Sequence, residues 1–237
     1  MRSFKPGLYK SSAGIRVMDN RIKIIYEDKD IIVCHKFPGI AVQSARTGEK
    51  DMESELKSYL HIKEPDKPLY LAVVHRLDQP VEGVIVFAKN KRSAASLSAQ
   101  ASGKDEAGMR KEYRAEVFGC MPSEEGTLTD YLIRDPKTNT SSVTSDTVRG
   151  KKAVLHYKVK ETTDKTQVLS ILLETGRHHQ IRVQLSHAGA PITGDLKYGS
   201  EESIRYSEEN EIRTTSLKAA KLDFTHPSTG KRMSFEV

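Results

Sequence analysis

An aspartate that follows an apolar segment is the first residue whose type and position suggest chemistry. Residues 71–74 are apolar and lead into residues 75–78, which read His-Arg-Leu-Asp. A loop at this place can hold a short carboxylate rigidly beside a cleft. An ionised Asp78 could then act as a nucleophile that bonds to a sugar or base carbon. The alternative is structural, with Asp78 capping a turn and Arg76 paired with it.

A tyrosine in an expected strand is the second candidate. Tyr113 lies in residues 111–115, Lys-Glu-Tyr-Arg-Ala, and residues 112–118 alternate as a strand does. An aromatic ring can stack against a nucleobase, which is how flipped bases are commonly held. The tyrosine hydroxyl can also accept or donate a proton. The alternative is that Tyr113 packs in the core or across strands.

The third candidate is a segment rich in basic side chains. Residues 174–182 read Glu-Thr-Gly-Arg-His-His-Gln-Ile-Arg. Gly176 permits a sharp turn into a helix predicted for residues 178–188, and a helix N-terminus is a natural phosphate site. His178 and Arg182 share one polar face of that helix. The guanidinium fork of Arg182 is suited to hold a carboxylate in its charged form. The alternative is a solvated basic helix face.

Metal and disulfide chemistry are not indicated. The side chains that could be imagined as metal ligands are His178, His179, His187 and Asp195. They lack a recognised ligand spacing such as H-E-x-x-H, so we expect no catalytic metal. Cys34 and Cys120 each lie among apolar, strand-like neighbours. We therefore predict two buried thiols in a reducing cytoplasm rather than a disulfide framework.

The composition fits a globular protein that meets a polyanion. The chain has 237 residues, of which 37% are hydrophobic and 30% charged, with a net charge of +6 and a pI of about 9.1. A basic balance permits nucleic-acid binding, because neutralising phosphates releases counterions. The sequence contains no apolar run long enough to span a membrane and no secretory signal at its N-terminus.

The elements that must position these residues are mostly strands. Strands are expected at residues 23–26, 31–35, 84–88, 112–118, 153–159, 167–173, 217–224 and 232–237. Helices are expected around Met52, Leu56 and Leu60 and at residues 91–101 and 178–188. Many strands adjacent in sequence favour an α+β fold with a mostly antiparallel mixed sheet. Residues 1–20 look like an irregular arm, and the polar residues 135–152 like a flexible excursion.

Taken together, these segments resemble the pseudouridine synthases of the RluA family, which modify ribosomal and transfer RNA. The resemblance covers about residues 22–237. Its motifs, in chain order, are residues 24–33, Lys36, Pro38-Gly39, residues 75–78, Gly83, Ala88-Lys89, residues 111–113, 175–182, 189–199 and 222–230. Several motifs in the right order and at suitable separations make a chance resemblance improbable.

The resemblance implies a pseudouridine synthase fold with flanking helices and loops that form a central RNA-binding cleft. It implies Asp78 as the nucleophile, Tyr113 as the ring stacked on the base, and Arg182 as the partner that keeps Asp78 ionised. Attack at ribose C1′, attack at the base and an elimination route all stay open. Arg76 is implied to enter the RNA helix when the uridine flips out. The RNA-binding residues implied are His75, Arg76, Arg177, His179 and Gln180. The resemblance implies no cofactor, no metal, no membrane and a monomer.

The chain departs from the family pattern near its candidate site. Val81-Glu82 stands where the family usually has Thr-Ser, and His178 and Gln184 also differ. These changes concern target specificity more than activity. The side chains in residues 135–152 that are candidates for RNA selection, unless they are merely solvated, are Lys137, Arg149, Lys151 and Lys152.

The expected organisation is an N-terminal arm, residues 1–21, followed by one catalytic domain, residues 22–237. Many relatives of that family carry a small RNA-binding module before the catalytic domain, and we expect no separate module of that kind here. Two other functions compete with a uridine isomerase. One is a catalytically inactive RNA-binding or assembly protein of the same fold, and the other is a metal-dependent nuclease or phosphotransferase.

Overall fold

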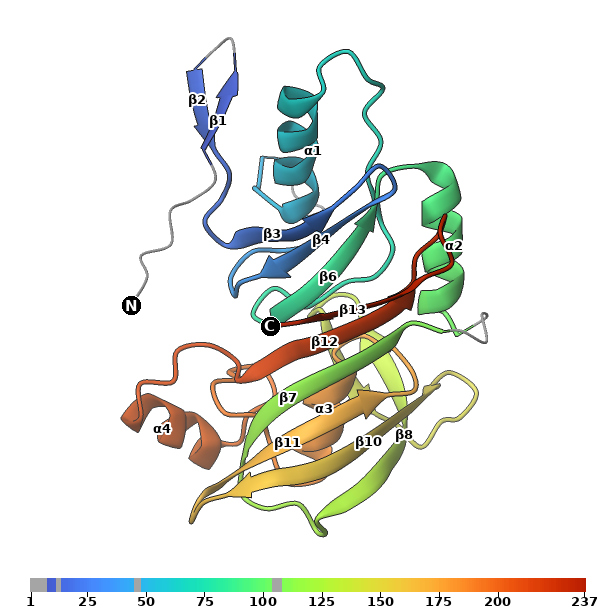
Figure 1. The fold of residues 1–237 in the computed structure, drawn as a ribbon. Coiled ribbons are helices and arrows are strands. Elements are labelled where there is room, and N and C mark those ends of the chain that lie inside the picture. The colour runs from blue at the N-terminus through green and yellow to red at the C-terminus, as the bar shows by residue number, and fades with distance from the viewer. Residues whose placement is uncertain (1–7, 12–13, 45–47, 104–107) are drawn as a thin grey trace. The chain divides into compact units, whose positions relative to one another are not determined.

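A computed structural model describes residues 8–11, 14–44, 48–103 and 108–237. The chain forms two compact units, one of residues 1–109 and 222–237 and the other of residues 110–221 (Figure 1). Strand β12, Leu217–Thr225, begins in the second unit and ends in the first. By the bounds of the two units, Asp78 belongs to the first unit, whereas Tyr113 and Arg182 belong to the second.

The first unit is built around strands with both faces covered. Its strands are β3 Ile22–Glu27, β4 Ile31–Lys36, β5 Ala72–Val73, β6 Glu82–Ala88 and β13 Arg232–Glu236. Its helices are α1 Met52–Lys63 and α2 Lys91–Ala101. β4 pairs with β3 on one side and β6 on the other, both antiparallel. Ile31, Val33, Val84 and Val86 pack with Leu97 of α2 in one buried cluster.

Local sequence signals explain where α1 begins. Asp51 is the N-cap residue, and its side chain accepts a hydrogen bond from the Ser54 amide at 2.7 Å while the Ser54 hydroxyl accepts from the Asp51 amide at 3.2 Å. Met52, Leu56 and Leu60, spaced four apart, are all buried. The predicted amphipathic helix is therefore confirmed.

The second unit holds the longer strands. They are β7 Arg110–Phe118, β8 Glu125–Asp135, β9 Thr140–Val143, β10 Lys151–Thr162 and β11 Thr166–Leu173. Its helices are α3 Gln180–His187 and α4 Glu201–Glu209. The strand order is β7-β11-β10-β8-β9, and each of these neighbours is antiparallel. Leu155, Leu169 and Ile171 are buried in this sheet.

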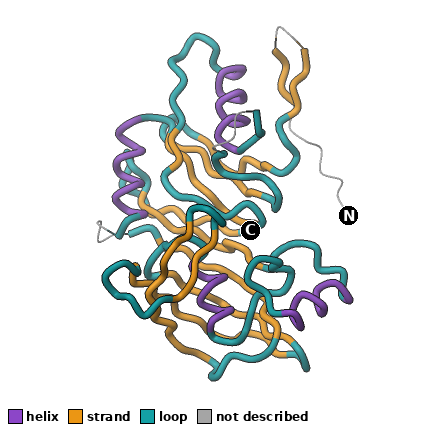
Figure 2. The backbone as a smooth tube through the Cα atoms, turned by 180° about the vertical axis from the view of Figure 1, so that it is seen from behind, coloured by secondary structure: helices purple, strands orange, loops and turns teal. Residues whose placement is uncertain are grey.

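The α+β class with mostly antiparallel pairing is confirmed. Figure 2 shows extended strands with a few short helices between them. Among the residues that the structure describes, no helix is long and apolar enough to cross a membrane. β8 and α4 were not predicted, because their polar residues mask the periodicity that marks a buried face. The central RNA-binding cleft stays a prediction.

The predicted flexible excursion at residues 135–152 is wrong in part, because residues 140–143 form a strand. β9 pairs with β8 in register, with Leu132 opposite Val143 and Asp135 opposite Thr140. The turn between them is ordered by Asp135, whose carboxylate accepts from the Lys137 amide and the Thr138 hydroxyl, each at 2.9 Å. Polar β-branched residues such as threonine fit an edge strand, so polarity alone did not indicate a loop.

The predicted irregular arm is also wrong in part. β1 Leu8–Ser11 and β2 Gly14–Val17 pair as two antiparallel strands. The rest of the expected arm at residues 1–7 and 12–13 lies outside the described residues.

The two cysteines differ from each other. Cys34 on β4 is buried, as predicted, but Cys120 is exposed. Cys120 follows Gly119, whose φ of 86° turns the chain just after β7 ends. The apolar neighbours of Cys120 belong to the strand, whereas the cysteine itself lies in the turn.

Candidate active site

The loop that carries Asp78 is tied to the neighbouring strand. The carbonyl of Asp78 accepts a hydrogen bond from the Val81 amide at 3.0 Å, which closes a tight turn. His75 precedes this turn, and its Nε2 accepts from the Val86 amide of β6 at 3.2 Å. An imidazole nitrogen that accepts an N–H carries no proton, so His75 is held as a neutral ring against β6.

A buried lysine lies against the same loop. The Lys36 side chain is fully buried, and its ammonium donates to the carbonyls of Phe37 at 3.3 Å, Gln79 at 2.9 Å and Val81 at 2.7 Å. Burial lowers the pKa of Lys36 to about 8, and the nearby charge of Asp78 opposes that shift. The ammonium thus fixes the backbone that follows Asp78. The sequence signal was a lone lysine at the end of an apolar strand, but it gave no role.

Replacing Lys36 should displace the Asp78 loop. We expect Lys36→Met to lower the free energy of unfolding by about 2–4 kcal/mol, because buried carbonyls lose a charged donor. Since the pKa of Lys36 is about 8, we also expect wild-type turnover to fall above that pH as the anchor loses its charge. Denaturant unfolding and a pH profile of turnover measure both effects. The exposed Lys29→Met is the matched control, and an equal effect of the two substitutions would contradict this role.

Arg76 is available for a ligand. Its side chain is exposed, and among the described parts of the chain it makes no hydrogen bond or ion pair. The structural alternative in which Arg76 pairs with Asp78 is therefore wrong. An exposed guanidinium two residues before Asp78 is suited to contact a phosphate or fill a gap in a base stack.

Tyr113 occupies the middle of β7 in the second unit. It lies opposite Ile171 of β11, and Glu112 lies opposite Leu172. The Tyr113 side chain is 8% exposed, and Ala115 and Val117 on the same face are buried. The segment of residues 174–182 leaves β11 just beyond this point. The second and third sequence candidates are therefore neighbours within one sheet.

Gln180 shapes this segment from the inside. Its side-chain oxygen accepts from the Thr175 hydroxyl at 2.8 Å and the Arg177 amide at 2.9 Å, and its amide donates to the Val154 carbonyl at 3.0 Å. Gln180 is 3% exposed. Because its polar atoms are occupied within the fold, Gln180 acts in building the turn. Arg177, by contrast, is exposed.

The sharp turn predicted at Gly176 occurs at His179 instead. His179 has a φ of 54° and is the N-cap residue of α3, so the helix begins at Gln180. A left-handed backbone is strained for a residue with a side chain. His179 is held there by a 2.7 Å hydrogen bond between its Nδ1 and the Tyr198 hydroxyl, and by stacking on His178 at 3.7 Å.

His179 makes the fold sensitive to acid. Burial, together with the charges of Arg182 and Lys197, lowers the pKa of His179 to about 4. An unfolded histidine titrates near 6.5, so its stabilising contribution is complete above that pH and is lost as the pH falls toward 4, by up to about 3 kcal/mol. We expect His179→Asn, which tolerates the left-handed backbone, to lose less stability between pH 7.5 and 4.5 in urea unfolding. The exposed His61→Asn should behave as wild type; equal acid sensitivity in all three proteins would refute the assignment.

Arg182 forms a buried fork with an aspartate. Its Nε and Nη2 donate to the two carboxylate oxygens of Asp195 at 2.6 and 2.7 Å, and the side chains are only 5% and 1% exposed. The guanidinium also lies 5.0 Å from the centre of the Tyr198 ring. The alternative of a solvated basic helix face is therefore wrong. Sequence reasoning considered Asp195 only as a metal ligand and missed this pairing.

A possible metal group was also missed, but its chemistry does not fit an ion. Among the described residues, Asp28, Asp30 and His226 bring potential ligand atoms within 4.8 Å of one another. His226 Nδ1 accepts from the amides of Ser228 and Thr229 at 3.3 and 3.2 Å, so Nε2 carries the proton and donates to Asp28 at 2.8 Å. Neither ring nitrogen has a lone pair left for a metal.

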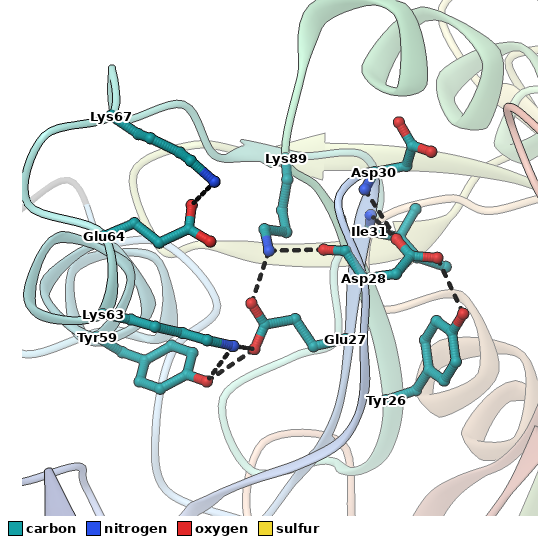
Figure 3. A network of polar contacts seen from close by, with 10 residues as sticks. All are labelled: Tyr26, Glu27, Asp28, Asp30, Ile31, Tyr59, Lys63, Glu64, Lys67 and Lys89. Carbon is teal, nitrogen blue, oxygen red and sulfur yellow. Dashed lines mark hydrogen bonds and ion pairs between the residues drawn. The ribbon is translucent and has the colours of Figure 1, made fainter.

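A polar network beside these residues joins helix to sheet (Figure 3). Glu27 of β3 accepts from Lys63 at 2.8 Å, Lys89 at 2.6 Å and the Tyr59 hydroxyl at 2.7 Å. Burial raises the pKa of Glu27, but these hydrogen bonds outweigh it and the pKa is lowered. A cavity of about 320 Å³ adjoins the network. Because Lys63 and Lys89 already balance the negative charge of Glu27, we interpret this cluster as one that stabilises the fold.

Comparisons with known proteins identify a matching family and similar proteins. Residues 30–187 match the family described as RNA pseudouridylate synthase. The uncharacterised RNA pseudouridine synthase YlyB of Bacillus subtilis is 34% identical over 221 residues, which span 91% of this chain and 68% of that protein. Ribosomal large subunit pseudouridine synthase C of Buchnera aphidicola subsp. Schizaphis graminum is 33% identical, over 89% of this chain and 65% of its own. The chain thus spans about two thirds of the length of these relatives.

Solved structures share the fold. Human RNA pseudouridylate synthase domain containing 4 aligns with a TM-score of 0.73 at 21% identity, covering 90% of this chain and 87% of its own. Human RNA pseudouridylate synthase domain containing 1 aligns with a TM-score of 0.70 at 22% identity, covering 91% and 82%. At these identities the likeness concerns the fold.

Proposed function

This chain belongs to the RNA pseudouridylate synthase family, and from that premise we propose that it isomerises specific uridines in RNA to pseudouridine. The carrying observation is that Asp78 lies within the matched residues 30–187, on a loop held by Lys36 and His75. Relatives named as ribosomal large subunit enzymes favour ribosomal RNA as the substrate, with transfer RNA as the second class to test.

The reaction needs a nucleophile and a way to retain the detached base. In the proposed reaction the bond between ribose C1′ and uracil N1 breaks, a new bond joins C1′ to carbon 5, and the carbon 5 proton is replaced by one at N1. Each route open to this chemistry uses an ionised Asp78. The isomerisation is redox-neutral and transfers no group to or from another molecule, so it requires no redox or group-transfer cofactor.

We assign the other two catalytic roles to the second unit. Tyr113 is the proposed ring that stacks on the target base and a candidate proton acceptor. Arg182 is the proposed partner that keeps Asp78 ionised, because a nearby guanidinium opposes protonation of a carboxylate. The fork between Arg182 and Asp195, at 2.6 and 2.7 Å, supports this role by fixing the guanidinium in one orientation.

RNA contacts are proposed at the exposed cations. Arg76 would occupy the place of the flipped uridine, and Arg177 would contact a phosphate. His75, His179 and Gln180 were predicted to bind RNA, but their hydrogen bonds give them a supporting role in the two loops. The acidic Glu82, one of the departures from the family pattern, is paired with His35 at 2.8 Å.

The catalytically inactive alternative is not supported by the family and its named relatives.

The proposal is tested with unmodified ribosomal RNA transcribed with uridine tritiated at carbon 5. Because carbon 5 loses its hydrogen when it bonds to C1′, the isomerase releases tritium while RNA length is unchanged. We expect release that EDTA does not affect. RNA shortening that EDTA stops, or no release from ribosomal or transfer RNA, would overturn the proposal.

A further inference from the structure

The cations of β7 fall into two kinds. Arg110 and Arg114 are exposed and ion-paired, with Glu112 at 3.3 Å and Glu161 at 2.7 Å respectively. Lys111 lies between them and is partly buried, and its ammonium has no hydrogen bond or ion pair with any residue that the structure describes. The proposed reaction has so far used Tyr113 of this strand and not Lys111.

The register of β7 sets Lys111 beside the candidate catalytic tyrosine. Successive side chains of a strand point to opposite faces, so Lys111 and Tyr113 share one face, about 7 Å apart along the strand. Arg110, Glu112 and Arg114 lie on the other face. Glu112 pairs with Leu172, so Lys111 is also next to the end of β11, from which residues 174–182 continue.

Among the residues that the structure describes, no anion compensates the charge of Lys111. Burial lowers the pKa of the Lys111 ammonium, and no charged neighbour contributes to that shift. Withdrawing a cation from water is unfavourable unless a partner offsets the loss of hydration. A ligand that brings negative charge to this face would supply the missing partner.

We propose that Lys111 binds a backbone phosphate of the RNA next to the uridine that stacks on Tyr113. This inference rests on the proposed function, because RNA is the polyanion that the enzyme meets. Lysine is a compact phosphate-binding charge on a flexible stem. A phosphate is negative before the reaction begins, so Lys111 acts in binding the substrate rather than in the chemical step.

The first test measures RNA affinity as a function of salt. Unmodified large-subunit ribosomal RNA made in vitro is bound to wild type, Lys111→Met, Lys111→Arg and the exposed control Lys160→Met. Losing one contact to single-stranded RNA reduces the slope of log K against log salt by about 0.7. We expect this change and about tenfold weaker binding for Lys111→Met, which corresponds to about 1.4 kcal/mol. Lys111→Arg should largely restore both, and Lys160→Met should match wild type.

Two further readouts separate this role from others. The thermal midpoint of Lys111→Met should equal or exceed that of wild type, because the substitution removes an uncompensated buried charge. A marked fall in the midpoint would show that Lys111 stabilises the folded protein, and this would overturn the proposal. With an RNA that wild type converts, the KM of Lys111→Met should rise while its kcat is retained. A loss confined to kcat would place Lys111 in the chemical step and would also overturn the proposal.

The outcome is independent of whether the isomerase activity is found. If wild type releases no tritium from carbon 5, the proposed function fails, whereas the salt slope of RNA binding still measures the Lys111 contact. An unchanged slope and affinity in Lys111→Met, with tritium release intact in wild type, would overturn the Lys111 contact alone.

Discussion

Asp78→Asn is expected to abolish pseudouridine formation while the protein stays folded and still binds RNA. The substitution keeps the size and shape of the side chain but removes the negative charge that a nucleophile needs. We expect turnover to fall by at least about 10³-fold, as happens when the nucleophile of a covalent mechanism is removed. Tritium release from carbon 5 measures the loss.

The control for Asp78→Asn must show that only chemistry is lost. The protein should stay folded and RNA affinity should match wild type, since the backbone carbonyl of Asp78 that closes the turn is unchanged by the substitution. Glu82→Gln is a matched loss of one negative charge close by and should retain turnover. Turnover near the wild-type level in Asp78→Asn would remove Asp78 from the mechanism.

Arg182→Ala should lose both most of its activity and a large part of its stability. The substitution leaves the Asp195 carboxylate, whose side chain is 1% exposed, buried without its partner. Breaking a buried ion pair in this way costs about 3–5 kcal/mol. Activity falls for a second reason, because in our proposal Asp78 also loses the charge that keeps it ionised. Denaturant unfolding and tritium release measure the two effects separately.

A double substitution separates folding from catalysis at this pair. Arg182→Met with Asp195→Asn removes both charges together, which often restores much of the stability that a single substitution loses. We expect this protein to unfold close to wild type and yet to stay inactive. If it recovers activity along with stability, Arg182 serves only the fold.

Local patterns predicted the parts of the structure that depend on neighbours in sequence. The spacing of Met52, Leu56 and Leu60 indicated α1, and the apolar run before Asp78 indicated a loop at the end of a strand. The motifs of the three candidate segments identified the family. These signals are short-range, since the apolar spacing of a helix face or the alternation of a strand extends over only about ten residues.

Features set by distant contacts could not be predicted. Lys36 is buried because it meets carbonyls more than 40 residues further along the chain. The turn lies at His179 rather than Gly176 because Tyr198 holds the imidazole from 19 residues away. Polar β9 is a strand because β8 offers it an edge. Side-chain partners that lie this far apart leave no periodic trace in the sequence.

The most direct test compares pseudouridine maps of total RNA from cells with and without this protein. Carbodiimide labelling and primer extension locate each pseudouridine, and wild type or Asp78→Asn is returned to the deletion strain. We predict sites that disappear on deletion, return with wild type and stay absent with Asp78→Asn, which would also name the target RNA. Identical maps in all four strains, or sites restored equally well by Asp78→Asn, would contradict the central claim.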